Sequence, residues 1–211
     1  MTEISNRYKT AQEEFWAGSF GTEYIGRNSA ESQTLASTTA FFSRILASTS
    51  DITSLVEFGA NIGLNLEAIL RILPHAAMTA LEINSDACAE LKRRVPAVRV
   101  VNESILESVF TDSFDLVLIK GVLIHINPDE LNSVYEKLAA ASSRYVIIAE
   151  YYNPTPVAIS YRGHGDRLFK RDFASEFLDR HPEFKLRDYG FVWRRDPVFP
   201  QDDITWFLLE K

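Results

Sequence analysis

The amino-acid sequence predicts an α/β protein built on a mostly parallel sheet with crossover helices. Segments with strand-like and helix-like patterns alternate between residues 54 and 152, and such alternation is typical of parallel sheets, because parallel neighbours need long crossover connections. The chain has 211 residues, of which 46% are hydrophobic, and it shows no repeat or low-complexity tract. We therefore expect a single domain with a full core.

The N-terminal region precedes this alternation. Apolar residues recur with helical spacing over residues 8–17 and 29–47. Glycines in the intervening AGSFGTEYIGRN indicate a turn between the two helices. We expect residues 1–48 to form a helical cap on a cofactor-binding core at 49–150.

The remaining elements follow from the alternation of apolar runs and turn residues. The core is expected to contain strands at 54–58, 78–83, 98–101, 114–120 and 144–152, and helices at 64–73, 86–95 and 128–141. Residues 151–211 are expected to bind the acceptor and to supply the last strands. Their first part, up to residue 171, has the composition of a long binding loop. A helix at 172–181 and two antiparallel strands, 185–193 and 203–211, complete a seven-stranded sheet with an antiparallel C-terminal edge strand.

Composition argues against several kinds of partner. The net charge is −7 and the basic residues are scattered, which is unlike a nucleic-acid-binding surface. The longest apolar run, LVLIKGVLIHI, is interrupted by Lys120 and is too short to span a bilayer. The single cysteine, Cys88, lies in a helical pattern and is expected in the core. We expect a cytoplasmic protein with neither a nucleic-acid nor a membrane partner, and no metal site, since the four histidines lack ligand spacing.

The turn after the first strand, in VEFGANIG, indicates the ligand. In doubly wound sheets the ligand binds beyond the carboxyl ends of the strands. A dinucleotide turn requires glycine at 59, 61 and 64, but the chain has Gly59, Asn61 and Leu64. S-adenosylmethionine has no pyrophosphate, and it carries an ammonium that an acid near the turn can bind. Glu57, at the end of the strand, is the expected acid.

The other residues of the turn fit the same ligand. Gly59 and Gly63 are expected to let the backbone approach the methionine part closely. Asn61 replaces the middle glycine of the usual turn, and asparagine is one of the few residues that tolerate positive φ.

Polar residues also follow the later strands. Glu82 ends the second strand, where a carboxylate can accept both ribose hydroxyls, and Ile83 is expected to pack on adenine. Three residues after the third strand are expected at the adenine edge: Asn102, Glu103 and Ser104. Lys120, after the fourth strand, is expected between cofactor and acceptor. Glu57 and Glu82 have an alternative role as mere caps of the following helices, but the order of all these features is that of a Rossmann-like class I methyltransferase.

Two residues of the cap join this prediction. Tyr24 and Arg27 lie in the expected turn between the first two helices. Arg27 is placed to bind the cofactor carboxylate as the cap excludes water.

The chain also resembles the methylases associated with pseudaminic acid biosynthesis. The resemblance covers nearly the whole chain and is carried by EEFWAGSFGTEYIGRN, VEFGANIGLNLEAI, VLIHINPDEL, IAEYYNPTPVAISYRGHGDRLFKRDFASEF and DYGFVWRRDPVFPQDDITWFLLEK. It implies an S-adenosylmethionine-dependent enzyme that acts on a nonulosonic acid, the acidic nine-carbon sugar of flagellin glycosylation and surface polysaccharides. The partner is then a small acidic sugar or a sugar nucleotide.

Such an acceptor calls for cations and aromatic donors. The residues expected to bind it follow the fifth strand: Tyr151, Tyr152, Asn153, Tyr161, Arg162 and Arg171. If the acceptor is a hydroxyl, His125 is the first choice of base and His164 the second. An amine or amidine acceptor needs a base less.

Two other functions remain open. One is an NAD-dependent nucleotide-sugar enzyme, disfavoured by the missing glycines. The other is a non-catalytic S-adenosylmethionine-binding protein of the same pathway. The aromatic content of 12% permits an oligomeric interface without locating one.

Overall fold

The computed structural model describes residues 8–26, 32–161 and 164–211. Its main feature is a seven-stranded sheet with the strand order β3-β2-β1-β4-β5-β9-β8. The strands are β1 (Ser54–Phe58), β2 (Ala77–Glu82), β3 (Arg99–Asn102), β4 (Phe114–Lys120), β5 (Ser142–Glu150), β8 (Lys185–Val192) and β9 (Ile204–Glu210). The predicted Rossmann-like fold with a mostly parallel seven-stranded sheet is confirmed.

Pairing within the sheet follows the expected directions. Strands β1 to β5 are parallel to their neighbours, whereas β9 is antiparallel to both β5 and β8. The last strand thus lies one position inside the edge, because the chain first crosses to the outermost position as β8 and then returns. The central strands β1 and β4 are almost wholly buried, as continuous apolar runs in a covered parallel sheet should be.

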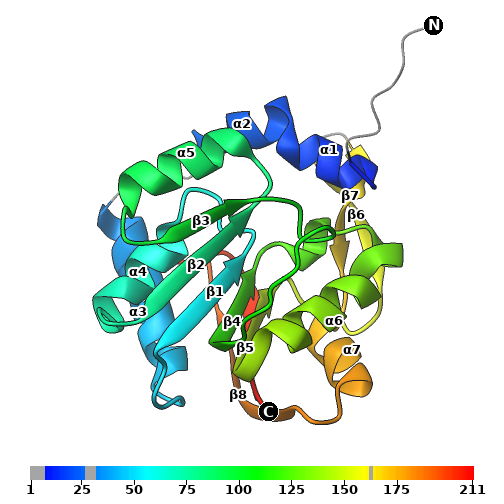
Figure 1. Cartoon of the computed structure of the whole chain (residues 1–211). Helices are drawn as coiled ribbons and strands as arrows, with labels where there is room; N and C mark the ends of the chain where they lie inside the picture. Colours follow the sequence, from blue (N-terminus) through cyan, green and yellow to red (C-terminus); the bar gives the residue numbers. More distant parts are fainter. Residues whose placement is uncertain (1–7, 27–31, 162–163) are drawn as a thin grey trace, which may run out of the picture.

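Helices cover both faces of the sheet (Figure 1). The helices α3 (Ser32–Leu46), α4 (Leu64–Ile72) and α5 (Ser85–Arg94) pack on one face, and α6 (Leu131–Ala141) and α7 (Phe173–Arg180) pack on the other. Short 3₁₀ turns, η1 (Leu123–His125) and η2 (Pro128–Glu130), connect β4 to α6. Within the described ranges, no helix is both long enough and apolar enough to cross a membrane.

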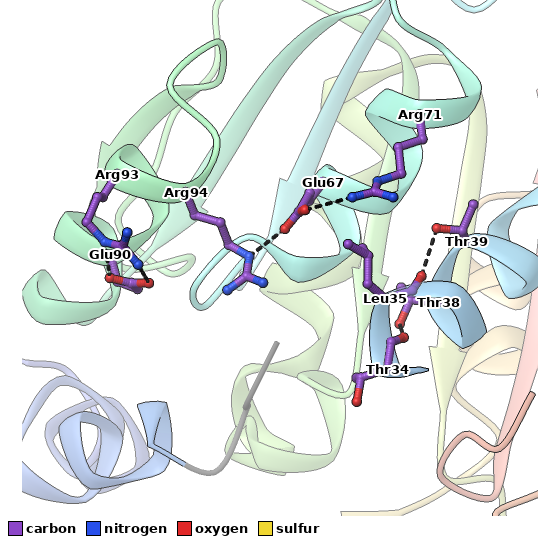
Figure 2. A network of polar contacts seen from close by, with 9 residues as sticks. All are labelled: Thr34, Leu35, Thr38, Thr39, Glu67, Arg71, Glu90, Arg93 and Arg94. Carbon is purple, nitrogen blue, oxygen red and sulfur yellow. Dashed lines mark hydrogen bonds and ion pairs between the residues drawn. The ribbon is translucent and has the colours of Figure 1, made fainter. Parts of the chain in front are cut away.

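Polar contacts join α4 to α5 (Figure 2). Glu67 on α4 accepts hydrogen bonds from Arg71 at 3.2 Å and from Arg94 on α5 at 2.6 Å. The Arg94 side chain is only 14% exposed, so this pair is less screened by solvent than a surface ion pair. The contact fixes α5, whose N-terminus carries part of the site described below.

The cap consists of α1 (Ala11–Ala17) and α2 (Ser19–Ile25), which lie over the end of the sheet toward which β1 and β2 point (Figure 1). Thr10 and Glu13 form a capping box at the start of α1. The turn expected at 18–26 is wrong, because most of it is helical as α2. Gly21 marked this segment as a turn, but it is a packing residue: a Cβ there would lie 1.9 Å from the backbone oxygen of Trp16.

The loop expected at 153–171 is also partly wrong. Most of it forms a two-stranded antiparallel sheet, β6 (Val157–Tyr161) and β7 (His164–Lys170). β7 contacts η1, and Leu168 is buried in the core on the α6–α7 side. Leu168, Tyr161 beside the same core and the backbone oxygen of Arg167, bonded to His125, attach a hairpin whose β6 strand is mostly exposed.

Candidate functional site

A pocket of about 280 Å³ lies at the carboxyl ends of the central strands, beneath the cap. This volume is near the lower end for small-molecule sites. Its walls come from the turn after β1, the end of β2, residues 104–106, residues 120–127, the cap and the entry to β9. The pocket therefore occupies the position that the fold predicts for a ligand.

The turn after β1 has the predicted backbone conformation. Asn61 has φ of 47°, and Gly59 and Gly63 have φ of 77° and 81°. Packing within the protein gives a further reason for both glycines. A Cβ on Gly59 would lie 2.5 Å from the Val122 side chain, and one on Gly63 would lie 2.8 Å from that of Leu91. The glycines make room for protein packing, and only Gly59 lines the pocket.

Glu82 lines the pocket, and backbone donors hold both of its carboxylate oxygens. One of its oxygens accepts a hydrogen bond from the backbone N–H of Asn61 and the other from that of Asn84, both at 2.8 Å. Burial raises the pKa of the Glu82 carboxyl, and the bonds from Asn84 and Asn61 oppose that rise. Each oxygen keeps a lone pair, so the carboxylate can accept two further bonds from a pair of hydroxyls. Ile83, predicted to pack on adenine, lines the pocket next to it.

Glu57 does not line the pocket. It is fully buried, and its Oε1 accepts a hydrogen bond from Nδ2 of Asn65 at 2.6 Å. Its Oε2 has no hydrogen-bond partner within the described part of the chain. Burial raises the pKa of the Glu57 carboxyl to about 8, against the opposing effects of Asn65 and Lys120.

Asn65 lines the pocket and lies between Glu57 and the cavity, and sequence reasoning missed it. Its signal in the sequence is an amide side chain in the first turn of the helix that directly follows the glycine turn, in GLNLEAIL. The pocket wall nearest to Glu57 is therefore formed by this amide.

Of the three residues expected at the adenine edge, only Ser104 lines the pocket. Its hydroxyl donates to Oε1 of Glu13 on α1 and accepts from the backbone N–H of Leu106. Asn102 turns away, because its Nδ2 donates to the backbone oxygens of Glu82 and Ile83. Glu103 is exposed to solvent.

Asn84 attaches the cap to the core and was not predicted. Its Oδ1 accepts from the backbone N–H groups of Asp86 and Ala87, so it caps the N-terminus of α5. Its Nδ2 donates to the backbone oxygen of Trp16 at 3.2 Å. An asparagine directly before a helical pattern, as in NSDACAEL, is the signal that could have identified it.

Lys120 lies in the pocket wall among acids at the strand ends. Burial lowers the pKa of its ammonium, and the charges of Glu57, Asp202 and Glu150 oppose that shift. Glu150 was not predicted, although it ends the fifth strand as Glu57 and Glu82 end the first two. Its Oε1 accepts from the backbone N–H groups of Val122 and Leu123, each at 2.9 Å, and burial raises its pKa to about 7.

His125 lines the pocket, with its ring 4.6 Å from that of Trp16 and 5.3 Å from that of Tyr161. Its Nδ1 lies 2.6 Å from the backbone oxygen of Arg167. Since a carbonyl only accepts, Nδ1 carries the proton and Nε2 keeps the lone pair. Burial lowers the pKa of the imidazole to about 4. His125 can therefore accept a proton at Nε2, but its low pKa makes it a weak base. His164 begins β7, and its side chain lies outside the described residues.

The residues expected to bind the acceptor divide into two groups. Tyr151 and Tyr161 line the pocket together with Tyr24 of the cap. The Tyr151 hydroxyl donates to Asp202, which lines the pocket as well. Asp202 lies at the entry to β9, and its sequence signal is the acid pair before the last strand.

The structure does not bring Tyr152, Asn153 and Arg171 to the pocket. Successive residues of an extended chain point to opposite sides, so Tyr152 turns away from the side of Tyr151 and lies near Phe207. Arg171 pairs with Glu176 at 2.7 Å, and Asn153 donates to the backbone oxygen of Thr155. Arg27 and Arg162 lie outside the described residues.

Comparison with known proteins identifies the fold and the domain. Residues 55–143 match the family model described as a methyltransferase domain. Residues 55–143 thus carry the methyltransferase domain. No curated protein sequence matches it.

Solved structures agree with this assignment. A 1,6-didemethyltoxoflavin N1-methyltransferase from Burkholderia thailandensis, crystallised with S-adenosylhomocysteine, is 17% identical with a TM-score of 0.68, over 95% of this chain and 86% of that one. Magnesium protoporphyrin IX methyltransferase from Synechocystis, with bound S-adenosylmethionine, is 13% identical with a TM-score of 0.68, over 98% and 100%. An N-methyltransferase from Bradyrhizobium japonicum, with bound S-adenosylhomocysteine, is 13% identical with a TM-score of 0.65, over 88% and 90%.

The methyltransferase domain on a class I methyltransferase fold agrees with the predicted enzyme class, an S-adenosylmethionine-dependent methyltransferase, and with its predicted cofactor. The narrower resemblance to pseudaminic acid methylases stays a prediction. The pocket of this methyltransferase domain also fits the cofactor by its chemistry. Glu82 offers acceptors for the two hydroxyls of a ribose. Ser104 and its apolar neighbours offer a cleft for the adenine ring, and Lys120 offers a cation for the cofactor carboxylate.

Proposed function

We propose that the protein transfers the methyl group of S-adenosylmethionine to a hydroxyl or amine of a small acidic sugar. The sugar is of the nonulosonic acid type, free or CMP-linked, or a related surface-glycan precursor. The observation that carries the cofactor part is the Glu82 carboxylate, held in the pocket wall by two backbone N–H groups. The acceptor part rests on the family resemblance and on the tyrosines at the cap side of the pocket.

The cofactor is proposed to lie along the turn after β1. Glu82 binds the ribose hydroxyls, and Ser104 binds the base beside Ile83. Lys120 binds the carboxylate, with Arg27 as a second cation of the cap. Glu57 acts through Asn65, because it orients the amide whose oxygen faces an ammonium. When bound, the cofactor supplies a methyl group activated by its sulfonium.

The acceptor is proposed to bind beneath the cap. Tyr24, Tyr151 and Tyr161 present aromatic faces and hydroxyls, which suit the C–H faces and hydroxyls of a sugar. The Asp202 carboxylate accepts from Tyr151 and keeps lone pairs for a further donor. The rings of Trp16 and His125 help to exclude water from the pocket. Holding the acceptor in line with the methyl donor lowers the activation barrier by roughly 7–11 kcal/mol in favourable cases.

His125 is proposed to take the proton through Nε2 when the acceptor is a hydroxyl. Because its pKa is about 4, it is far from the value that suits a base at neutral pH. This favours an acceptor that needs little help from a base, such as an amine or amidine on the sugar. His164 remains the second proposed base.

A labelling experiment tests the proposal. The purified protein is incubated with methyl-labelled S-adenosylmethionine and a panel of pseudaminic acid, its CMP conjugate, a legionaminic analogue and an amidino derivative. One labelled product, one methyl heavier, is the expected result, and fragmentation then identifies the methylated atom. Glu82→Gln should abolish labelling at limiting cofactor, whereas the exposed Glu103→Gln should not.

The outcomes separate the parts of the proposal. Saturable cofactor binding without labelling of any panel member would reject these acceptors and favour the non-catalytic alternative or a later glycan intermediate. Retention of NAD in place of S-adenosylmethionine would reject the cofactor assignment itself.

A further inference from the structure

An exposed apolar surface lies on β8, far in sequence from the cofactor turn. It is called the β8 aromatic face here and consists of Leu186, Tyr189, Phe191, Trp193 and the neighbouring Tyr152. The exposed fractions are 48% for Leu186, 63% for Tyr189, 52% for Phe191, 49% for Trp193 and 42% for Tyr152. Single exposed apolar side chains are ordinary, but a contiguous group of this size marks an interaction site.

The register of the sheet places these side chains on one face. Tyr189 lies directly opposite Phe207 of β9, and their rings are stacked at 6.3 Å. Leu186 lies opposite Leu209. Directly opposed residues share a face of the sheet, and Phe207 and Leu209 belong to the core on the α6–α7 side.

The remaining members extend the same surface. Phe191 and Trp193 follow Tyr189 at intervals of two residues, the period of one strand face. Tyr152 lies on the other side of Phe207, with ring centroids 6.4 Å apart. The helices α6 and α7 pack over β4 and β5, and the layer they form leaves the side chains on β8 about half exposed.

We propose that the β8 aromatic face is the interface of a homodimer with two-fold symmetry. An aromatic side chain covers about 150–250 Å², so these five half-exposed side chains present roughly 500 Å². A standard interface buries about 800 Å² per partner and is about 65% apolar in homodimers, which also gives roughly 500 Å² of apolar surface. The apolar area of the face therefore matches that of a standard homodimer interface.

The charges around the face favour a second copy over a charged partner. The whole chain has a net charge of −7, so most of its surface repels a copy of itself. Without Asp202, which lines the pocket, residues 185–203 contain four basic and three acidic side chains and are nearly neutral as a group. Contact through this segment brings two copies together where their mutual repulsion is least.

The proposed contact is through the face and not through the free edge of β8. The pairing of β8 with β9 has an irregular register at Leu186 to Asp188, and the intervening residue is Arg187. A bulge and charged residues on an outer strand are the usual protection against pairing of sheet edges. The two-fold axis therefore passes between two aromatic faces packed against each other.

Sedimentation velocity on the full chain, from about 1 to 100 μM, tests the proposal. The wild-type protein is expected to sediment as a dimer at the upper concentrations. The double variant Tyr189→Ser, Phe191→Ser is expected to raise the dissociation constant about 100-fold or more, because buried aromatic side chains dominate interface energies. Trp193→Ser, as a second variant, should act in the same direction.

Val109→Ser is the matched control, since Val109 is 81% exposed and lies outside the face. It should leave the dimer unchanged. Affinity for S-adenosylhomocysteine should be the same in all variants, since none of the changed residues lines the pocket. Far-UV circular dichroism should show that all variants are folded, and their unfolding midpoints are compared at a concentration where each is monomeric, because dimer formation itself stabilises the folded state. A wild-type protein that is monomeric over the whole range overturns the proposal. So does a dimer that persists in the Tyr189→Ser, Phe191→Ser variant, since it must use another surface.

Discussion

Glu57→Gln should remove much of the pH dependence of the folding stability. Burial raises the pKa of the Glu57 carboxyl from 4.5 to about 8. Between these two values the folded chain keeps a proton that the unfolded chain has released. The unfolding free energy therefore falls as the pH rises through this window, and the contribution of Glu57 is fully present only below its unfolded pKa.

The magnitude follows from the shift. One proton of difference changes the unfolding free energy by about 1.4 kcal/mol per pH unit. From about pH 5 to about pH 8 the Glu57 contribution falls by roughly 3–4 kcal/mol, a large part of the 5–15 kcal/mol stability of a typical domain. Glutamine cannot ionise, so this part of the slope should disappear. A smaller slope of the same sign should remain, because burial also raises the pKa of Glu150, to about 7.

Urea unfolding followed by far-UV circular dichroism over this pH range measures the effect. The exposed Glu103→Gln is the control and should keep the wild-type slope. A wild-type stability that is constant or increases from pH 5 to pH 8 would refute the reasoning, as would equal slopes for wild type and Glu57→Gln. Either result would mean that the carboxyl stays ionised in the folded chain, stabilised by Lys120 or by water.

Three further predictions concern the pocket. Glu82→Gln should weaken binding of S-adenosylhomocysteine about 10- to 100-fold by calorimetry, since charge-assisted hydrogen bonds contribute about 1.5–3 kcal/mol each; unchanged affinity would exclude Glu82 from the ribose site. Gly59→Ala should destabilise the fold by about 2 kcal/mol or more in urea unfolding, because its φ is positive and the new Cβ meets Val122. Val122→Ala in the same chain should restore part of this loss, and no recovery would mean that φ alone is responsible. If the acceptor is a hydroxyl, His125→Ala should lose methyl transfer about 100-fold and keep cofactor affinity, whereas an amine or amidine acceptor should lose much less; equal turnover across the pH range would remove His125 from the mechanism.

The sequence sufficed to predict the parallel strands of the sheet and the conformation of the turn after β1. Alternating apolar runs predicted the parallel strands, because a strand buried on both faces must be apolar throughout. The conformation of Asn61 followed from its residue type, since few residues accept positive φ. The acid at the end of β2 was also found in this way, because Glu82 needs only its local position to face the crevice.

Prediction from local sequence patterns failed where contacts between different elements determine the secondary structure. The segment at 18–26 contains glycines and was expected as a turn, yet it forms α2 because Gly21 fits closely against α1. The hairpin β6–β7 was missed because its order depends on burial of Leu168 in a distant core. Leu168 packs against residues far from it in sequence, and Gly21 lies close to the distant Asn84 as well as to the nearby Trp16.

The sequence by itself determined the fold class, the end of the sheet at which the pocket lies and the presence of the Glu82 carboxylate there, since these depend on periodicity and on residue type. Only the tertiary structure decided which polar residues face the cavity. In the structure, Asn65 lies between Glu57 and the pocket. Tyr151 lines the pocket, whereas Tyr152 does not. The physical reason is that a side chain's direction and partners are fixed by packing and by hydrogen bonds between elements far apart in the chain.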